Sequence, residues 1–233
     1  MPRAPRFLLP QVPVHIVQRG HNRFPCFERH RDKAAYLRLL TDELPASGCV
    51  VHAYVLMPNH VHMLITPPTG PALSDLMRVV NQRYGQHYYN RTYERTGAVW
   101  QGRFFASVIE DEAYFLRCQR YIELNPVRGR LCAHAADYVW SSYVANVEGI
   151  DSFIQPHELF MRLGRTEVVR RSAYEALVRE GLAAPEVEAI RAAIKRNRPL
   201  RHFPSLEGPA RARPRKTKGP EGPPMIELAA AVA

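Results

Sequence analysis

The chain has 233 residues, of which 46% are hydrophobic and 23% charged, so it suits one medium domain with its own core plus an extension. Its formal net charge is +10 at pH 7, and many of its arginines lie near the motifs described below, which favours a polyanion as partner. No apolar run approaches the 18 or so residues of a membrane span, which excludes a membrane-spanning helix. The N-terminal MPRAPRFLLP lacks the apolar stretch of a signal peptide, so we expect a cytoplasmic protein.

The first part of the chain alternates strand and helix patterns. Residues 12–18 predict a first strand, and residues 31–44 predict a helix with apolar side chains at helical spacing. Residues 49–57 are apolar and β-branched, which indicates a buried strand. Pro58-Asn59 then makes a tight turn into a further strand over residues 60–66.

A helix, a short strand and a third helix are predicted next. Apolar residues at helical spacing mark a helix that starts near Ser74, and residues 106–109 form a fourth strand. Asp111-Glu112 supply acidic N-terminal residues for the third helix, which runs to Leu124. Asn125-Pro126 ends it, because the residue before a proline avoids the helical region.

This order of elements, β-α-β-β-α-β, is that of a ferredoxin-like split βαβ sheet. We therefore predict an α+β fold with an antiparallel sheet, the two middle strands at its centre, and the third helix appended. We assign residues 1–145 to this domain. Residues 146–198 form a helical extension, with amphipathic helices over 167–182 and 184–195, and residues 199–233 form a basic, proline-rich tail that is expected to be disordered.

Four cysteines occur without a CxxC spacing or a paired framework. We interpret them as reduced thiols of a cytosolic protein, with Cys49 and Cys118 in the core.

Two histidines open the strand over residues 60–66. Side chains alternate faces along a strand, so His60 and His62 point the same way and can hold one metal ion. Their apolar flanks make a costly place for unpaired imidazoles, which a metal would satisfy. The alternative is two ordinary polar side chains on an exposed sheet face. His15 and His52 lie on neighbouring strands, and for both the favoured interpretation is a core or edge histidine.

The string YIELNP at residues 121–126 ends the third helix. Tyr121 and Asn125 are four residues apart and share a helix face. With the histidine pair and the basic charge, this tyrosine indicates phosphodiester chemistry on nucleic acid. Tyr114 shares the face and is the rival nucleophile, and the alternative for Tyr121 is packing on the sheet. Asn125 can also act as a helix C-terminal cap, while Glu123 is expected to point elsewhere and be solvated.

These strings also carry a family resemblance. Residues 15–23 (HIVQRGHNR), 54–62 (YVLMPNHVH), 100–104 (WQGRF) and 121–128 (YIELNPVR) resemble, in order and spacing, the REP-associated tyrosine transposases. That family is IS200-like and belongs to the HUH single-strand nuclease superfamily. The resemblance implies Tyr121 as the catalytic nucleophile, because the family's tyrosine precedes the asparagine of the NP dipeptide by four residues. It implies His60, His62 and Asn125 as ligands of Mg²⁺ or Mn²⁺, which the open coordination positions of such a site suit.

The resemblance further implies a reaction. Tyr121 would cleave and rejoin single-stranded DNA, at hairpins of the REP type, through a 5′-phosphotyrosine intermediate. A monomer and an exchanged-helix homodimer are both compatible with the sequence. One alternative is a catalytically silent module that binds a DNA or RNA hairpin. Another is a metal hydrolase that uses water, with Tyr121 structural.

Six side chains are expected to contact DNA, mostly because two segments, 18–23 and 100–104, resemble family segments near the bound strand. They are Gln18, Arg19, Arg23, Arg83, Trp100 and Arg103. The arginines would contact phosphates, and Trp100 or Phe104 would stack a base, with core packing as the alternative for both aromatics. A stretch of tyrosines and arginines over residues 83–93 fits single-strand binding or, equally, a helix end that covers the core.

Overall fold

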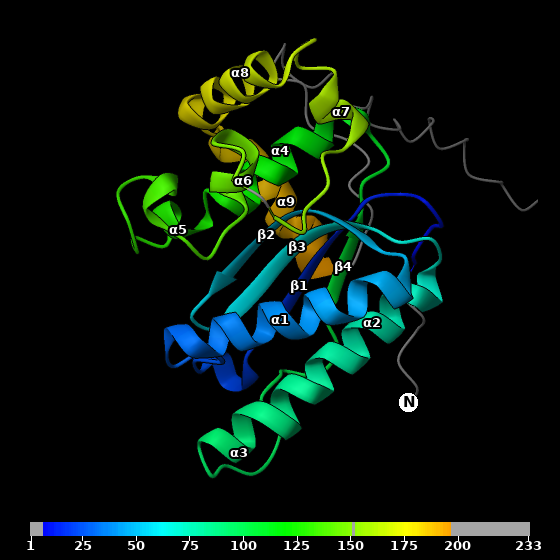
Figure 1. Cartoon of the computed structure of the whole chain (residues 1–233), viewed down its shortest axis with the longest axis vertical. Coiled ribbons are helices and arrows are strands. Elements are labelled where there is room, and N and C mark those ends of the chain that lie inside the picture. The colour runs from blue at the N-terminus through cyan, green and yellow to red at the C-terminus, as the bar shows by residue number, and fades with distance from the viewer. Residues whose placement is uncertain (1–6, 151, 197–233) are drawn as a thin grey trace, which may run out of the picture. The chain divides into compact units, whose positions relative to one another are not determined.

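An antiparallel sheet with the strand order β2-β3-β1-β4 organises the protein (Figure 1). The computed structural model describes residues 7–150 and 152–196, so the predicted tail over 199–233 lies outside the described residues. The strands are β1 (Val14–Arg19), β2 (Val50–Met57), β3 (His60–Thr66) and β4 (Phe105–Val108). This topology confirms the predicted ferredoxin-like α+β fold. The expectation that both middle strands are central was wrong for β2, which lies at an edge because β1 pairs with both β3 and β4.

The register of β1 against β3 decides which side chains meet on each face of the sheet. Val17 lies opposite His62, and Arg19 lies opposite His60. Directly paired residues of an antiparallel sheet point to the same face, and every second residue returns to it. His15, Arg19, His60 and His62 therefore share one face.

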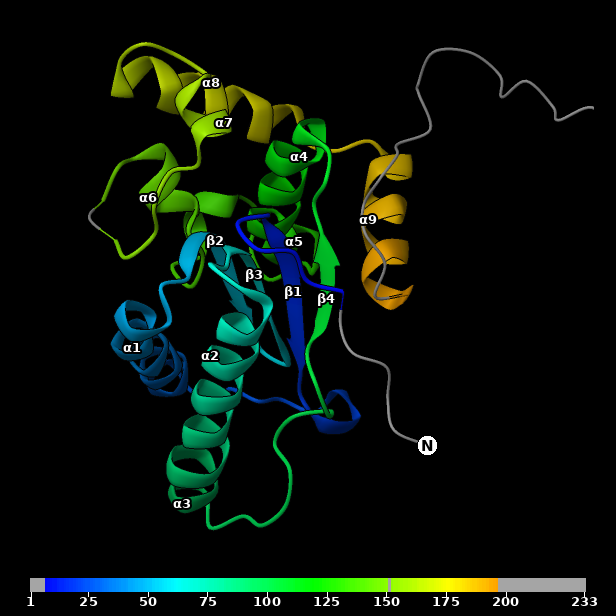
Figure 2. The same ribbon diagram turned by 90° about the vertical axis from the view of Figure 1, so that its right-hand side faces the viewer.

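Helices α1 (His30–Ser47) and α2 (Gly70–Gln82) cover the opposite face (Figure 2). Helix α2 begins at Gly70 rather than near Ser74, because the Thr69 hydroxyl accepts a hydrogen bond from the Ala72 N–H and Pro71 fits the first turn. It continues as a π-helical segment, η2 (Arg83–Tyr89), and as α3 (Asn90–Thr92).

Aromatic rings form the core between this helical layer and the sheet. The rings of Phe27, Tyr36, Tyr84 and Trp100 lie within 6.3 Å of one another, measured between the centroids of each contacting pair. Trp100 is 9% exposed and donates its indole N–H to the Asn81 carbonyl at 3.1 Å. Trp100 therefore occupies the position that the core-packing alternative describes, and the buried Phe104 does the same.

A buried carboxylate ties the stretch of tyrosines over residues 83–93 to α1. Asp32 accepts hydrogen bonds from the hydroxyls of Tyr88 at 2.8 Å and Tyr93 at 2.7 Å. The backbone N–H groups of Glu28 and Arg29 also donate to it. These contacts give the two tyrosines a structural role in closing the end of the helical layer.

The histidine-bearing face is covered by α4 (Glu112–Glu123) and α9 (Ala184–Arg196) (Figures 1 and 2). The chain does not leave the helical region at Asn125-Pro126, because Leu124 makes a turn from which α5 (Asn125–Arg128) starts, with the proline in its first turn. The remaining helical elements are η1 (His21–Arg23), η3 (Ala135–Asp137), α6 (Tyr143–Val147), α7 (Glu158–Met161) and α8 (Glu167–Glu180).

The two helices predicted for the extension, α8 and α9, are present within two residues of their expected bounds. All described residues belong to one compact unit. Across the described ranges, no helix has the length and apolar character needed to cross a membrane. The thiols are free, and Cys49 and Cys118 are buried as predicted.

Gly20, directly after β1, is a position where a side chain would disturb the fold. A Cβ there would lie 2.4 Å from the carbonyl oxygen of Phe24, a backbone atom. We expect Gly20→Ala to lower the free energy of unfolding by about 1–3 kcal/mol, measured by urea denaturation, because the loop must shift to relieve the overlap. Gly85→Ala is the matched control: its nearest neighbour is a Val99 methyl at 3.6 Å, so its stability should be unchanged or slightly raised. Equal stabilities of the two variants would contradict this view of the loop.

Candidate active site

Three imidazoles form a row on the face shared by β1 and β3. The Nε2 atom of His15 and the Nδ1 atom of His62 are 2.9 Å apart, a hydrogen bond. The ring centroids of His60 and His62 are separated by 4.9 Å. His15 and His62 are buried, and His60 is half-buried at the start of β3. The strand period therefore brings His60 and His62 together, and the pairing of β1 with β3 places His15 next to His62.

Burial keeps these imidazoles neutral. It lowers the pKa of His60 to about 4 and that of His15 to about 3, with the charges of Arg19 and Arg128 as respective secondary causes. The pKa of His62 is also held well below its ordinary value, chiefly by burial. Near neutral pH the rings keep the lone pairs that a metal ion needs.

Asn59 fixes the tautomer of His60. Its amide nitrogen donates to the Arg23 carbonyl at 3.1 Å, so its oxygen is the atom that faces His60 Nδ1 at 2.6 Å. Because an amide oxygen only accepts, the proton of His60 resides on Nδ1. The Nε2 atom therefore carries a free lone pair that can coordinate a metal ion, the arrangement usual for metal-binding histidines.

Tyr121 on α4 faces the imidazole row. Its ring centroid lies 5.8 Å from the ring of His15 and 5.8 Å from that of His62. Tyr121 is 5% exposed, whereas the rival Tyr114 is wholly buried in the core between α4 and the sheet. The predicted nucleophile and the predicted metal ligands thus lie together in one chain.

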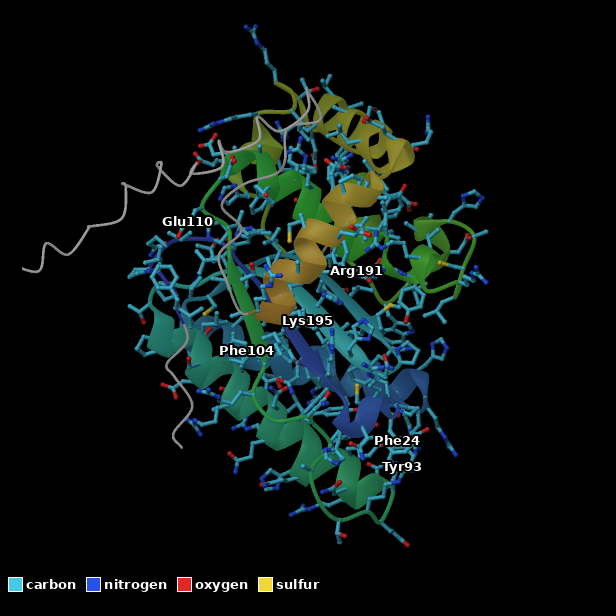
Figure 3. All side chains as sticks on the ribbon, turned by 180° about the vertical axis from the view of Figure 1, so that it is seen from behind. Phe24, Tyr93, Phe104, Glu110, Arg191 and Lys195 are labelled. Carbon is cyan, nitrogen blue, oxygen red and sulfur yellow. The ribbon has the colours of Figure 1, made fainter. Side chains whose placement is uncertain are left out.

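Arg128 covers Tyr121, a contact that the sequence analysis did not predict. Its guanidinium carbon lies 4.2 Å from the centre of the Tyr121 ring, and an N–H of the same group donates to the Tyr121 carbonyl. Burial lowers the pKa of Arg128 to about 10. Tyr121 opposes this shift, whereas the charge of Arg191 on α9, labelled in Figure 3, also lowers the pKa of Arg128. The sequence feature that could have indicated this contact is the spacing: Arg128 follows Tyr121 by seven residues, about two helical turns, inside the string YIELNPVR.

Asn125 lies beside Tyr121 as predicted and is 9% exposed. Its amide nitrogen donates to the Tyr121 carbonyl at 3.1 Å, which is the capping contact considered as its alternative role. Its amide oxygen is a hard donor of the kind that Mg²⁺ prefers, and the role of ligand stays a prediction. Within residues 7–150 and 152–196, no three His, Cys, Asp or Glu side chains gather as a metal site.

A family model described as "Transposase IS200 like" matches residues 9–125, which is half of the chain. The chain belongs to the family of IS200-like transposases. No curated protein matches it.

One similar structure is a REP-associated tyrosine transposase bound to a REP hairpin, with 17% sequence identity and a TM-score of 0.55. The match covers 68% of this chain and 93% of that one, and at this identity it supports the shared fold. A putative transposase from Deinococcus radiodurans also matches, at 17% identity and a TM-score of 0.35, over 52% of this chain and 95% of that one.

Glu123 in this transposase is buried, so the expectation that it is solvated was wrong. Its carboxylate is 0% exposed and accepts hydrogen bonds from Ser142 at 2.6 Å, Asn146 at 2.7 Å and Tyr174 at 2.7 Å. Burial raises its pKa to about 6, against the opposing effect of these three donors. Asn146 belongs to α6, Ser142 directly precedes α6, and Tyr174 belongs to α8. The sequence pattern of α4 alone does not predict that these residues pack against Glu123.

This carboxylate connects the helix of Tyr121 to the sheet and to the extension. Ser142 exchanges backbone and hydroxyl hydrogen bonds with Tyr54 of β2, each at 3.0 Å. On the neighbouring turn of α4, Arg120 donates to the carbonyls of Leu177 and Gly181 at the end of α8, both at 2.9 Å. Helix α4 is therefore held on both sides of the position that presents Tyr121.

The six predicted DNA contacts lie at four places. Arg19 and Arg23 line a cavity of about 260 Å³ with Asn59 and His60, next to the imidazole row. Gln18 and Arg103 line a second cavity, on the α2 face of the sheet. Arg83 pairs with Glu43 of α1, and Trp100 lies in the core. The cavity with Arg19 and Arg23 is thus the one that adjoins the candidate site.

The buried Glu123 predicts a distinct dependence of stability on pH. Its folded-state pKa of about 6 exceeds its ordinary value of 4.5, so its contribution is present at low pH and is lost as the pH rises through 6. Relative to the wild type, the unfolding free energy of Glu123→Gln should rise by about 2 kcal/mol between pH 4 and pH 8. Urea denaturation at both pH values measures it. Glu175→Gln, at an exposed ion pair with Arg179, should give a flat difference; a flat difference for Glu123→Gln would contradict the prediction.

Proposed function

We propose that this transposase is a metal-dependent tyrosine endonuclease and strand transferase that acts on single-stranded DNA. The observation that carries the proposal is the meeting of the Tyr121 ring with the rings of His15 and His62, at 5.8 Å each, on a basic protein. His60 lies beside His62 on the same face. A tyrosine beside neutral imidazoles that can hold a metal ion supplies the groups for metal-assisted phosphoryl transfer to a tyrosine.

His60, His62 and Asn125 would hold Mg²⁺ or Mn²⁺. Neutral imidazoles, a His60 tautomer set by Asn59 and an amide oxygen next to Tyr121 are compatible with this role. When bound, the metal supplies Lewis-acid polarisation of the scissile phosphate. Asn59 would act by keeping the lone pair of His60 on Nε2.

Tyr121 would perform the covalent step. Its phenol oxygen attacks the phosphorus atom and loses its proton, while the bond from phosphorus to the leaving 3′ oxygen breaks and that oxygen takes up a proton. The products are a 5′-phosphotyrosine and a free 3′-hydroxyl. Attack of a DNA 3′-hydroxyl on this link reverses the reaction and joins strands. Arg128, stacked on the Tyr121 ring, provides positive charge where a phosphate approaches.

Hairpins of the REP type are the proposed substrates. The similar solved structure is bound to a REP hairpin, which supports hairpins as the first DNA to test. The basic character of the chain fits a nucleic-acid ligand. Since Tyr121 and His62 meet within one chain, we propose that each chain supplies a whole site, without exchange of helices in a dimer.

Tyr121→Phe tests the nucleophile. With labelled single-stranded hairpins from the flanks of the gene and Mn²⁺, the wild type should give a covalent protein–DNA band on a denaturing gel. Tyr121→Phe should give none, with DNA affinity unchanged, because only the hydroxyl is removed. Tyr114→Phe is the matched control and should still form the band. Adduct retained in Tyr121→Phe and lost in Tyr114→Phe would move the nucleophile to Tyr114.

His62→Ala tests the metal site. The variant should bind Mn²⁺ at least about tenfold more weakly, by electron paramagnetic resonance of free Mn²⁺, and should lose metal-dependent cleavage. His87→Ala, at an exposed histidine of η2, should match the wild type in both assays. Unchanged Mn²⁺ affinity in His62→Ala would remove His62 from the metal site.

The same assays separate the alternatives. Cleavage without a covalent band would indicate a hydrolase that uses water. Hairpin binding with neither band nor cleavage, over several metals, would indicate the silent binding module.

A further inference from the structure

Phe24 is a large aromatic side chain that the fold leaves outside the core. It is 66% exposed, whereas Phe27, three residues later, is buried with the aromatic core. Figure 3 shows Phe24 beyond the end of β1. A single exposed aromatic residue is common on protein surfaces, so exposure alone assigns no role. The segment that carries Phe24, residues 20–24, has three further properties.

First, this loop is held firmly. The Gly20 N–H donates to the Asn59 carbonyl and the His21 N–H to the Val99 carbonyl, both at 2.8 Å. The Phe24 N–H donates to the His21 carbonyl at 2.9 Å, and the Asn59 amide closes on the Arg23 carbonyl. Phe24 is therefore presented to solvent by an ordered backbone, which reduces the entropy lost when a ligand binds.

Second, the loop stores backbone strain. Asn22 and Arg23 have φ angles of +50° and +61°, in the left-handed region that side-chain-bearing residues rarely adopt. Residues in this region are energetically unfavourable and gather at functional sites, where the surrounding structure maintains them. The contacts of Gly20 and Asn59 are what maintain them here.

One residue of the loop, Arg23, lines a basic cavity beside the candidate active site. Arg19, Arg23, Asn59 and His60 line a cavity of about 260 Å³. Arg19 is oriented by stacking on Phe105, with its guanidinium carbon 5.4 Å from that ring. Two guanidinium groups make this a site for an anion, and phosphate is the anion that guanidinium geometry suits. His60 belongs both to this cavity and to the proposed metal site.

We propose that residues 20–24 form a nucleotide subsite of this transposase. Arg19 and Arg23 hold a DNA phosphate next to the one that Tyr121 attacks, and Phe24 stacks on an unpaired base of the same stretch. Phe24 directly follows Arg23, with the two Cα atoms about 3.8 Å apart, so the two side chains can reach a base and a phosphate of one short stretch of strand. Stacking on an aromatic ring accepts any base, which makes the subsite tolerant of sequence. The inference rests on the proposed function.

The test measures binding alone. In a Tyr121→Phe background without divalent metal, fluorescence anisotropy gives the affinity for a labelled 12-mer of thymidylate and for a 12-mer of abasic sites with the same phosphates. Phe24→Ala should weaken binding of the thymidylate strand about 5- to 150-fold and leave the abasic strand unchanged. Arg23→Gln should weaken both strands and reduce the slope of log affinity against log salt by about 0.7.

Two matched variants complete the design. Phe7→Ala removes another exposed aromatic residue, at a distance in the chain from the loop, and should bind both strands like the parent. Phe24→Trp should restore thymidylate binding, because a larger ring stacks at least as well. Equal binding by Phe24→Ala and its parent, or equal losses on both strands, would overturn the subsite.

The covalent assay distinguishes a failed subsite from a failed function. If the protein with Tyr121 intact forms its metal-dependent adduct while Phe24→Ala binds thymidylate normally, the subsite is wrong and the transesterase stands. If neither strand binds the parent and no hairpin forms an adduct, both proposals fall.

Discussion

The geometry of the candidate site depends on one buried carboxylate. Glu123 lies two residues after Tyr121, so it occupies a different face of α4 and accepts hydrogen bonds while Tyr121 meets the histidines. A buried carboxylate without partners would be costly, and its three donors satisfy it only when α6 and α8 are in place. The extension after residue 145 therefore contributes to the position of a helix that belongs to the family-matching segment.

The sequence predicts the parts of the site that follow from local periodicity. The strand over residues 60–66 and its period of two place His60 and His62 together, and the spacing of four places Asn125 by Tyr121. Glu123 escaped prediction because its donors are 19 to 51 residues away along the chain. Arg128 escaped it because Pro126 was interpreted as an end of helical structure, whereas the chain enters a further helix, α5, whose last residue, Arg128, contacts Tyr121.

The residues predicted to contact DNA do not all lie on one face of the sheet, because side chains alternate along a strand. Gln18 and Arg19 are neighbours on β1, yet successive side chains point to opposite faces of a sheet. Gln18 accordingly bonds Asn81 of α2, while Arg19 lies with His60. A motif that is continuous in sequence is thus divided between the two faces of the sheet.

The stacking of Arg128 on Tyr121 has a steric consequence. One face of the phenol ring lies under a guanidinium group, and the His15 and His62 rings meet it at steep angles from the sheet. Because only 5% of the residue is exposed, an incoming group can reach Tyr121 through only a small part of its surface. In the proposed reaction, so restricted an approach would favour a flexible, unpaired backbone over the broad, stiff cylinder of a duplex. Access to Tyr121 would then select the strandedness of the DNA before any base is read.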